Sequence, residues 1–186
     1  MTVKEILKTT SAMLGREDVN AYLSGDTEAV GENTLPTVGV MVNLLNLVIG
    51  ELAGTFIPMV KTETAAANDG KVYYAYLIER ALEIKAVYDL SGDEISYKQS
   101  AEFIKVNADK VLVEYEYAPP NYGLEDEIGY TEKDGTAGAL AFGLAAEYSI
   151  SLGSFDEAVM WHKRYVDSIA EQRKLRNVTL KTRSFV

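Results

Sequence analysis

The sequence predicts an α+β fold: a small helical bundle with an inserted antiparallel β-sheet or sandwich and an extended C-terminal tail. Residues 1–57 and 136–176 have the apolar spacing of helices, whereas residues 58–120 alternate apolar and polar side chains as half-buried strands do. An acidic loop, residues 121–135, joins strands to helices, and residues 177–186 have no helical period. With 186 residues, 47% of them apolar, the chain can bury this core without disulfides, and it has no cysteine.

Three helices are expected in the N-terminal third. The first covers residues 3–14, the second residues 18–23, and the third begins at an N-cap, Thr34, and continues through Ala53. This third segment carries almost no charge, so a membrane span has to be considered. A spanning helix needs about 20 predominantly apolar residues. We expect a buried core helix instead, because two asparagines and several glycines interrupt the apolar run.

Five or six short strands are expected between Met59 and Tyr117, separated by turn sequences rich in Asn, Asp and Gly. Two of them show the alternation of a sheet with one buried face. The apolar positions in these two strands are Leu82, Ile84, Ala86, Tyr88, Val111, Val113, Tyr115 and Tyr117. Two prolines at positions 119 and 120 end the last strand, because proline cannot donate a ladder hydrogen bond.

A helical hairpin is expected to complete the bundle. Its helices occupy residues 137–152 and 155–176, with Asp134 or Thr136 as the first cap and a tight corner at Gly153. The second helix should pack on the bundle through one face, whose residues recur at spacings of three and four. These residues are Ala158, Trp161, Tyr165 and Ile169.

The C-terminal end differs in charge from the rest of the chain. Residues 163–186 hold seven of the eighteen Lys and Arg and two of the twenty-eight acids, in a protein of net charge −10. One interpretation is a solvated helix end, since cations are favoured near a helix C-terminus. The other, which we favour, is a docking tail. Its docking residues would be Lys174, Arg176, Leu180, Lys181, Arg183, Phe185 and Val186.

No pattern predicts catalysis, so we expect neither an enzyme nor a bound cofactor or metal. Glu114 and Glu116 share a strand face at a spacing suited to paired carboxylates, but both are expected to face solvent. The acids of residues 121–135 lack the fixed spacing of a calcium loop. His162 is the only histidine, and no nucleophile-elbow sequence accompanies it.

Three segments together resemble a known family. They are the strand end Tyr115-Glu116-Tyr117-Ala118-Pro119-Pro120, the helix Leu140-Ala141-Phe142-Gly143-Leu144-Ala145-Ala146-Glu147-Tyr148, and the helix start Phe155-Asp156-Glu157-Ala158-Val159-Met160-Trp161. In this order, after N-terminal helices, they resemble the head-to-tail adaptor proteins of tailed bacteriophages, also called connector or head-completion proteins. The resemblance spans most of the chain.

The resemblance implies a structural protein of the virion neck, assembled in the host cytoplasm. It implies a ring, usually of twelve subunits, whose C-terminal segment reaches the portal protein and whose other end receives tail or nozzle proteins. DNA would be passing cargo, and no membrane would be involved. Acids at a channel wall would repel phosphates, and Glu125, Asp126 and Glu127 are candidate lumen acids. Residues 1–162 are not expected to bind duplex DNA, because no cationic footprint is visible in them.

Two other functions remain open at this point. A helical hairpin can serve as a peptide-binding module, and the acidic loop could serve a small hydrolase. A closed ring of fixed stoichiometry would distinguish the adaptor from the peptide-binding module.

Overall fold

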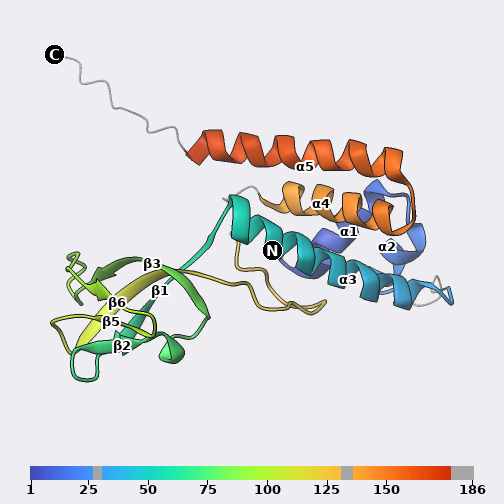
Figure 1. Cartoon of the computed structure of the whole chain (residues 1–186). Helices are drawn as coiled ribbons and strands as arrows, with labels where there is room; N and C mark the ends of the chain where they lie inside the picture. The colour runs from blue at the N-terminus through green and yellow to red at the C-terminus, as the bar shows by residue number, and fades with distance from the viewer. Residues whose placement is uncertain (27–30, 131–135, 177–186) are drawn as a thin grey trace, which may run out of the picture. The chain divides into compact units, whose positions relative to one another are not determined.

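The computed structural model describes residues 1–26, 31–130 and 136–176, and it describes side chains as far as Gln172. Within these residues the fold is α+β, as predicted. The chain divides into two compact units (Figure 1). The helical unit comprises Met1–Ile49 and the chain from Asn121 onward, and the β unit comprises Gly50–Pro120. The β unit therefore begins before residue 58, the start that the sequence predicts for the insertion.

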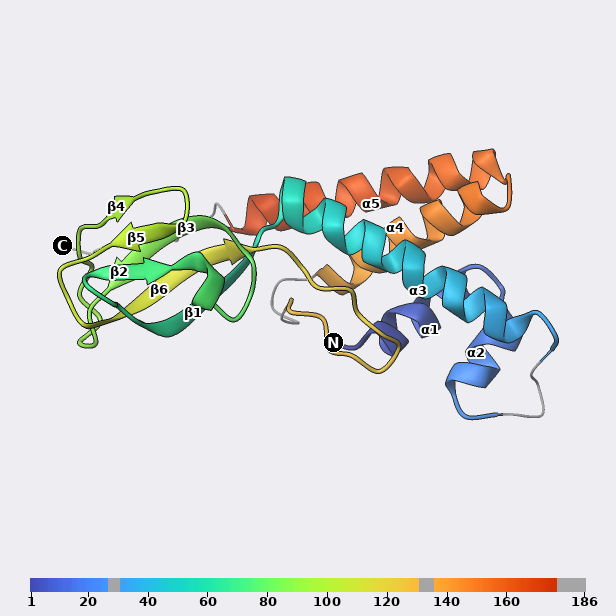
Figure 2. The same cartoon turned by 60° about the horizontal axis from the view of Figure 1, so that its bottom comes forward.

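The helical unit has five helices among the described residues: α1 Val3–Met13, α2 Glu17–Leu23, α3 Thr34–Glu51, α4 Thr136–Ser151 and α5 Phe155–Arg176. Helix α1 starts with a capping box, in which the Thr2 hydroxyl accepts from the Glu5 amide and the Glu5 carboxylate accepts from the Thr2 amide. Helices α4 and α5 lie side by side and antiparallel (Figures 1 and 2). Gly153 makes the corner between them at φ 76°, a conformation that glycine adopts without strain.

Helix α3 differs from its prediction at both ends. Thr34 is its first helical residue rather than its N-cap, and the Thr34 hydroxyl donates to Asp18 at 3.1 Å while accepting from the Gly31 amide at 3.0 Å. The α-helix ends at Glu51, and Leu52–Phe56 form a π-helical turn where we expected α-helix through Ala53. Hydrophobic periodicity does not distinguish these two helix types over a single turn.

The β unit contains six strands in two antiparallel sheets (Figure 2). The larger sheet has the order β1-β6-β3, with β1 Met59–Ala66, β6 Lys110–Tyr117 and β3 Ala81–Tyr88. The smaller has the order β2-β5-β4, with β2 Lys71–Tyr73, β5 Phe103–Lys105 and β4 Lys98–Gln99. Val72 and Ile104 of the smaller sheet share one buried cluster with Val87, Val113 and Tyr115 of the larger. The two sheets thus enclose a common core, as in a small sandwich.

The predicted alternation is found in β6 but not throughout β3. Val111, Val113 and Tyr115 are buried, as expected of one strand face. In β3 the pairing register shifts twice, between Ala81 and Glu83 and between Ile84 and Ala86. Leu82 is the extra residue of the first shift, between two paired neighbours, and it is 55% exposed, contrary to the prediction.

Candidate functional site

The described residues hold no group of three or more His, Cys, Asp and Glu side chains placed to bind a metal ion. Glu116 pairs with Lys85 at 2.6 Å, and Glu116 and Glu83 raise the pKa of that lysine. Glu114 accepts from the Tyr88 hydroxyl at 3.4 Å. His162 is exposed, with its ring 6.0 Å from that of Tyr165. Such contacts are ordinary on the solvent side of a sheet and on the surface of a helix.

Helix α1 and helix α3 both hold the acidic loop in place. The Val3 and Lys4 amides, at the open end of α1, donate to the carbonyls of Asp126 and Leu124 at 3.1 Å each. On the other side, the Asn46 amide group of α3 exchanges two hydrogen bonds with the Tyr122 backbone, at 2.8 and 2.9 Å. Asn46, which interrupts the apolar run of α3, therefore has a structural role as a clamp.

The three candidate lumen acids are all exposed on this loop. Glu125 pairs with Lys4 at 3.0 Å, and the Asp126 carboxylate accepts from the Gly123 amide at 2.7 Å. Glu127 forms an isolated β-bridge with Thr2. All three lie beside the N-terminus of α1, where negative charge is favoured. Local structure thus accounts for their position, and a lumen role stays a prediction.

The packing face predicted for α5 is buried. Ala158, Trp161, Tyr165 and Ile169 are between 1% and 9% exposed. The Trp161 ring stacks on Phe142 with centroids 6.1 Å apart, and the Arg164 guanidinium lies 5.1 Å from the indole centroid. This face joins α5 to α4.

The predicted docking residues lie mostly beyond the described part of the chain. Leu180, Lys181, Arg183, Phe185 and Val186 are outside the described residues. Lys174 and Arg176 belong to the last turns of α5, whose backbone is described there without its side chains. Portal docking by these residues stays a prediction.

An exposed apolar face on α3 corrects the expectation of a buried helix. One side of α3 packs inward through Val38, Met41, Leu45, Val48 and Ile49. The opposite side exposes Leu35 by 54%, Val40 by 44% and Leu47 by 65%. Thr34–Phe56 is the one helical stretch among the described residues long and apolar enough to cross a membrane, and 33% of its most apolar window is buried. We call the exposed side, with Leu35, Val40 and Leu47, the α3 face.

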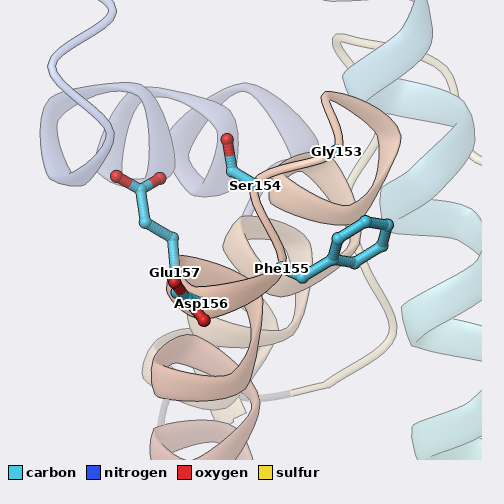
Figure 3. Close-up of a pocket in the computed structure, with 5 residues that line it drawn as sticks. All are labelled: Gly153, Ser154, Phe155, Asp156 and Glu157. Atoms are coloured by element: carbon cyan, nitrogen blue, oxygen red, sulfur yellow. The ribbon is translucent and has the colours of Figure 1, made fainter.

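A second exposed apolar surface lies on the hairpin of α4 and α5. Its residues are Ile150, Leu152, Phe155, Val159 and Val166, each at least 44% exposed. A hollow of about 370 Å³ opens there between Ile150, Phe155 and Val159. Phe155 points from the corner in the opposite direction to the Glu157 carboxylate (Figure 3). We call this surface the hairpin face.

Sequence reasoning missed both faces, although a signal was present. Helix α3 is apolar nearly all round, which is typical of a helix covered on both sides. In α5 the apolar positions form two adjacent stripes, and only the stripe with Trp161 and Tyr165 is buried in the helical unit.

No protein-family model matches the chain, and no curated protein matches its sequence.

Proposed function

We propose that this protein is a structural head-to-tail adaptor of a tailed bacteriophage. It forms a ring below the portal, joins the portal to tail proteins and lets DNA pass. The observation that carries the proposal is the exposure of large apolar side chains on two elements of the helical unit, at the α3 face and at the hairpin face. The segment resemblance to adaptor proteins supplies the biological setting.

Two different apolar faces favour a ring over a two-fold dimer. A dimer needs one self-complementary patch, whereas contact between two different patches repeats head to tail and forms a ring when the rotation between neighbours closes. The faces differ in composition. Leu35, Val40 and Leu47 of the α3 face are aliphatic, whereas the hairpin face includes the aromatic Phe155. Neighbouring subunits would pack the hairpin face of one against the α3 face of the next.

The absence of charge on the α3 face supports the same contact. No Asp, Glu, Lys or Arg occurs between Asn33 and Glu51. Burial of this face would therefore remove no charged group from water, which makes it suited to a permanent interface. Leu35, Val40 and Leu47 would lose most of their contact with water in such an interface, and burial of apolar surface is the main driving force for association.

Native mass spectrometry and sedimentation of the purified chain test the proposal. We expect a closed oligomer of one fixed size, and we expect Leu47→Asp or Val159→Asp to dissociate it, because either change buries an unpaired charge in the contact. Ala137→Asp, an exposed position in the first turn of α4, is the matched control and should leave the oligomer intact. A wild-type chain that stays monomeric at high concentration, alone and with a portal ring, would contradict the proposal.

The hollow on the hairpin face favours one alternative, a peptide-binding module. An amphipathic peptide helix would insert an apolar side chain between Ile150, Phe155 and Val159. Such a module would be monomeric, and Leu47→Asp would not affect it, because the α3 face would have no part in binding. The oligomeric state and the Leu47→Asp variant together distinguish the two functions.

A further inference from the structure

Three lysines form a row across the small sheet of the β unit. Lys105 of the central strand β5 is the register partner of both Lys71 in β2 and Lys98 in β4. Residues directly opposite in antiparallel strands point to the same side, with Cβ atoms about 5 Å apart. The inward side of this sheet carries Val72 and Ile104, both buried. The three ammonium groups therefore share its outer side.

This positive row is not neutralised within the described residues. No ion pair joins Lys71, Lys98 or Lys105 to an acid, whereas Lys4, Arg16 and Lys61 each have one and Lys85 has two. The strands themselves, with the sequences KVY, KQ and FIK, contain no acid. Like charges placed directly opposite destabilise a sheet. In a protein of net charge −10, three unpaired lysines in register point to an anionic ligand.

Aromatic rings adjoin the lysines on the same side. Tyr73 and Phe103 are register partners, with ring centroids 5.5 Å apart, and the Lys71 ammonium lies 5.0 Å from the Phe103 centroid. Tyr76, just after β2, places its ring 5.8 Å from that of Tyr73 and is 75% exposed. A large aromatic side chain with most of its surface in water is available for stacking.

A hollow of about 330 Å³ lies at one end of the lysine row. It is lined by Lys98 and Lys105 together with the polar residues Ser96, Tyr97 and Asn107. A phosphate group placed there would meet two ammonium groups and further hydrogen-bond donors. We call the outer side of the small sheet, with Lys71, Lys98, Lys105, Tyr73, Phe103 and Tyr76, the basic face.

We propose that the basic face binds single-stranded nucleic acid. Lysines neutralise the phosphates, and exposed aromatic rings stack on unpaired bases, which a duplex does not offer. This corrects the expectation that residues 1–162 have no cationic footprint, because strand register gathers lysines that are far apart in sequence. The inference goes beyond the adaptor proposal, in which DNA is only passing cargo, and it does not depend on ring assembly.

The number of lysines sets the expected salt dependence. Three phosphate contacts to a single strand give a slope of log K against log salt concentration of about −2. Raising the salt from 50 to 200 mM should therefore weaken the contribution of the basic face about 20-fold. Loss of the Tyr76 ring should weaken binding about tenfold at constant salt, because each stacked base contributes more than about 1 kcal/mol.

Fluorescence anisotropy of the full chain tests the proposal, with a labelled oligothymidine of about a dozen nucleotides as the probe. The key variant is the triple substitution Lys71→Gln, Lys98→Gln and Lys105→Gln. Its matched control removes three charges from the helical unit through Lys4→Gln, Lys8→Gln and Lys163→Gln. Both keep the five Lys and Arg of residues 173–186, so any binding by those residues cancels in the comparison. Thermal unfolding reports on folding, and relief of repulsion between the lysines should leave the key variant at least as stable as the wild type.

We expect the key variant to lose most of the binding and salt dependence, the control to keep them, and Tyr76→Ala to show the intermediate loss. Equal losses in the two triple variants would overturn the proposal, since net charge alone would then explain binding. Equal affinity for a duplex of the same length, or no effect of Tyr76→Ala, would also overturn it, because stacking on bases would have no role. Tighter, Lys98- and Lys105-dependent binding of polyglutamate would assign the face to an acidic protein partner instead.

Discussion

At the scale of single residues, one ion pair joins three helices of the helical unit. Arg16 binds the Asp18 carboxylate through two nitrogens at 2.9 and 3.0 Å, and it also donates to the Tyr148 hydroxyl of α4. The Thr34 hydroxyl at the start of α3 donates to the same carboxylate. The hydrogen bond from Arg16 is the main reason why the pKa of Asp18 lies well below its usual value. Asp18, in the first turn of α2, thus connects α2 to α3 and, through Arg16, to α4.

The lowered pKa predicts that Asp18 stabilises the fold only while it is ionised. Because the folded pKa is below the unfolded value of about 3.9, the stabilisation is present above that value and is lost as the pH falls through the folded pKa. Asp18→Asn should lower the free energy of unfolding by about 1 kcal/mol at pH 7, since the pair is partly exposed. Urea unfolding at pH 7 and pH 3 should show the difference from wild type shrinking at pH 3. Glu17→Gln, the exposed neighbour, should show no such difference, and a pH-independent effect of Asp18→Asn would argue against the ion pair.

Of the residues in α5, Trp161 should lower the free energy of unfolding most when it is replaced by alanine. It is 9% exposed, packs with Ala145 and Ala146, and stacks on Phe142. Trp161→Ala should lower the free energy of unfolding by about 3 to 5 kcal/mol, because it leaves a cavity between α4 and α5. Chemical denaturation followed by circular dichroism measures this. Phe155→Ala, on the same helix but 67% exposed, should cost far less in the monomer, and a loss under about 1 kcal/mol for Trp161→Ala would place that indole outside the core.

At the scale of elements, periodicity predicted most of the fold but not the surfaces that carry the proposals. The spacing of apolar residues placed helices α1, α2, α4 and α5 and the alternation in β6, because burial of one face controls those positions. It could not predict the π-helical turn after Glu51 or the register shifts of β3, which depend on tertiary packing. The row of Lys71, Lys98 and Lys105 depends on strand pairing, and no local pattern contains that information.

The crossing of α4 with α3 and α5 depends on one glycine. A Cβ at Gly143 would meet a Val48 methyl at 2.6 Å and the Tyr165 ring at 3.2 Å. Gly143→Ala should therefore destabilise the protein by about 1 to 3 kcal/mol, even though alanine favours helix formation. Gly138→Ala, on the same helix, meets nothing within 4 Å and should stabilise by up to about 1 kcal/mol. Melting temperatures that move in opposite directions would confirm the close packing, and equal shifts would contradict it.

At the scale of the whole molecule, the two units carry different surfaces, and we propose a different role for each. The helical unit carries the α3 face and the hairpin face, which suit contact between copies of the chain. The β unit carries the basic face, which suits a polyanion. Since each surface uses residues of one unit only, substitutions on one should leave the other's activity unchanged.

The C-terminal residues supply the last prediction at this scale. Residues 173–186 contain five Lys and Arg, no acid, and the apolar residues Leu180, Phe185 and Val186. A cationic, partly apolar segment at the end of an acidic chain is suited to binding a separate partner, and the adaptor proposal identifies this partner as the portal protein. A chain that ends at Asn177 should keep its circular dichroism spectrum and oligomeric state, because the buried residues of α5 precede that point. It should lose co-sedimentation with portal rings.

A full-length variant with Lys181→Gln and Arg183→Gln distinguishes charge from apolar contact. It should bind the portal more weakly and with less dependence on salt, since electrostatic attraction is screened as ionic strength rises. Undiminished portal binding by the truncated chain would show that docking uses a different surface.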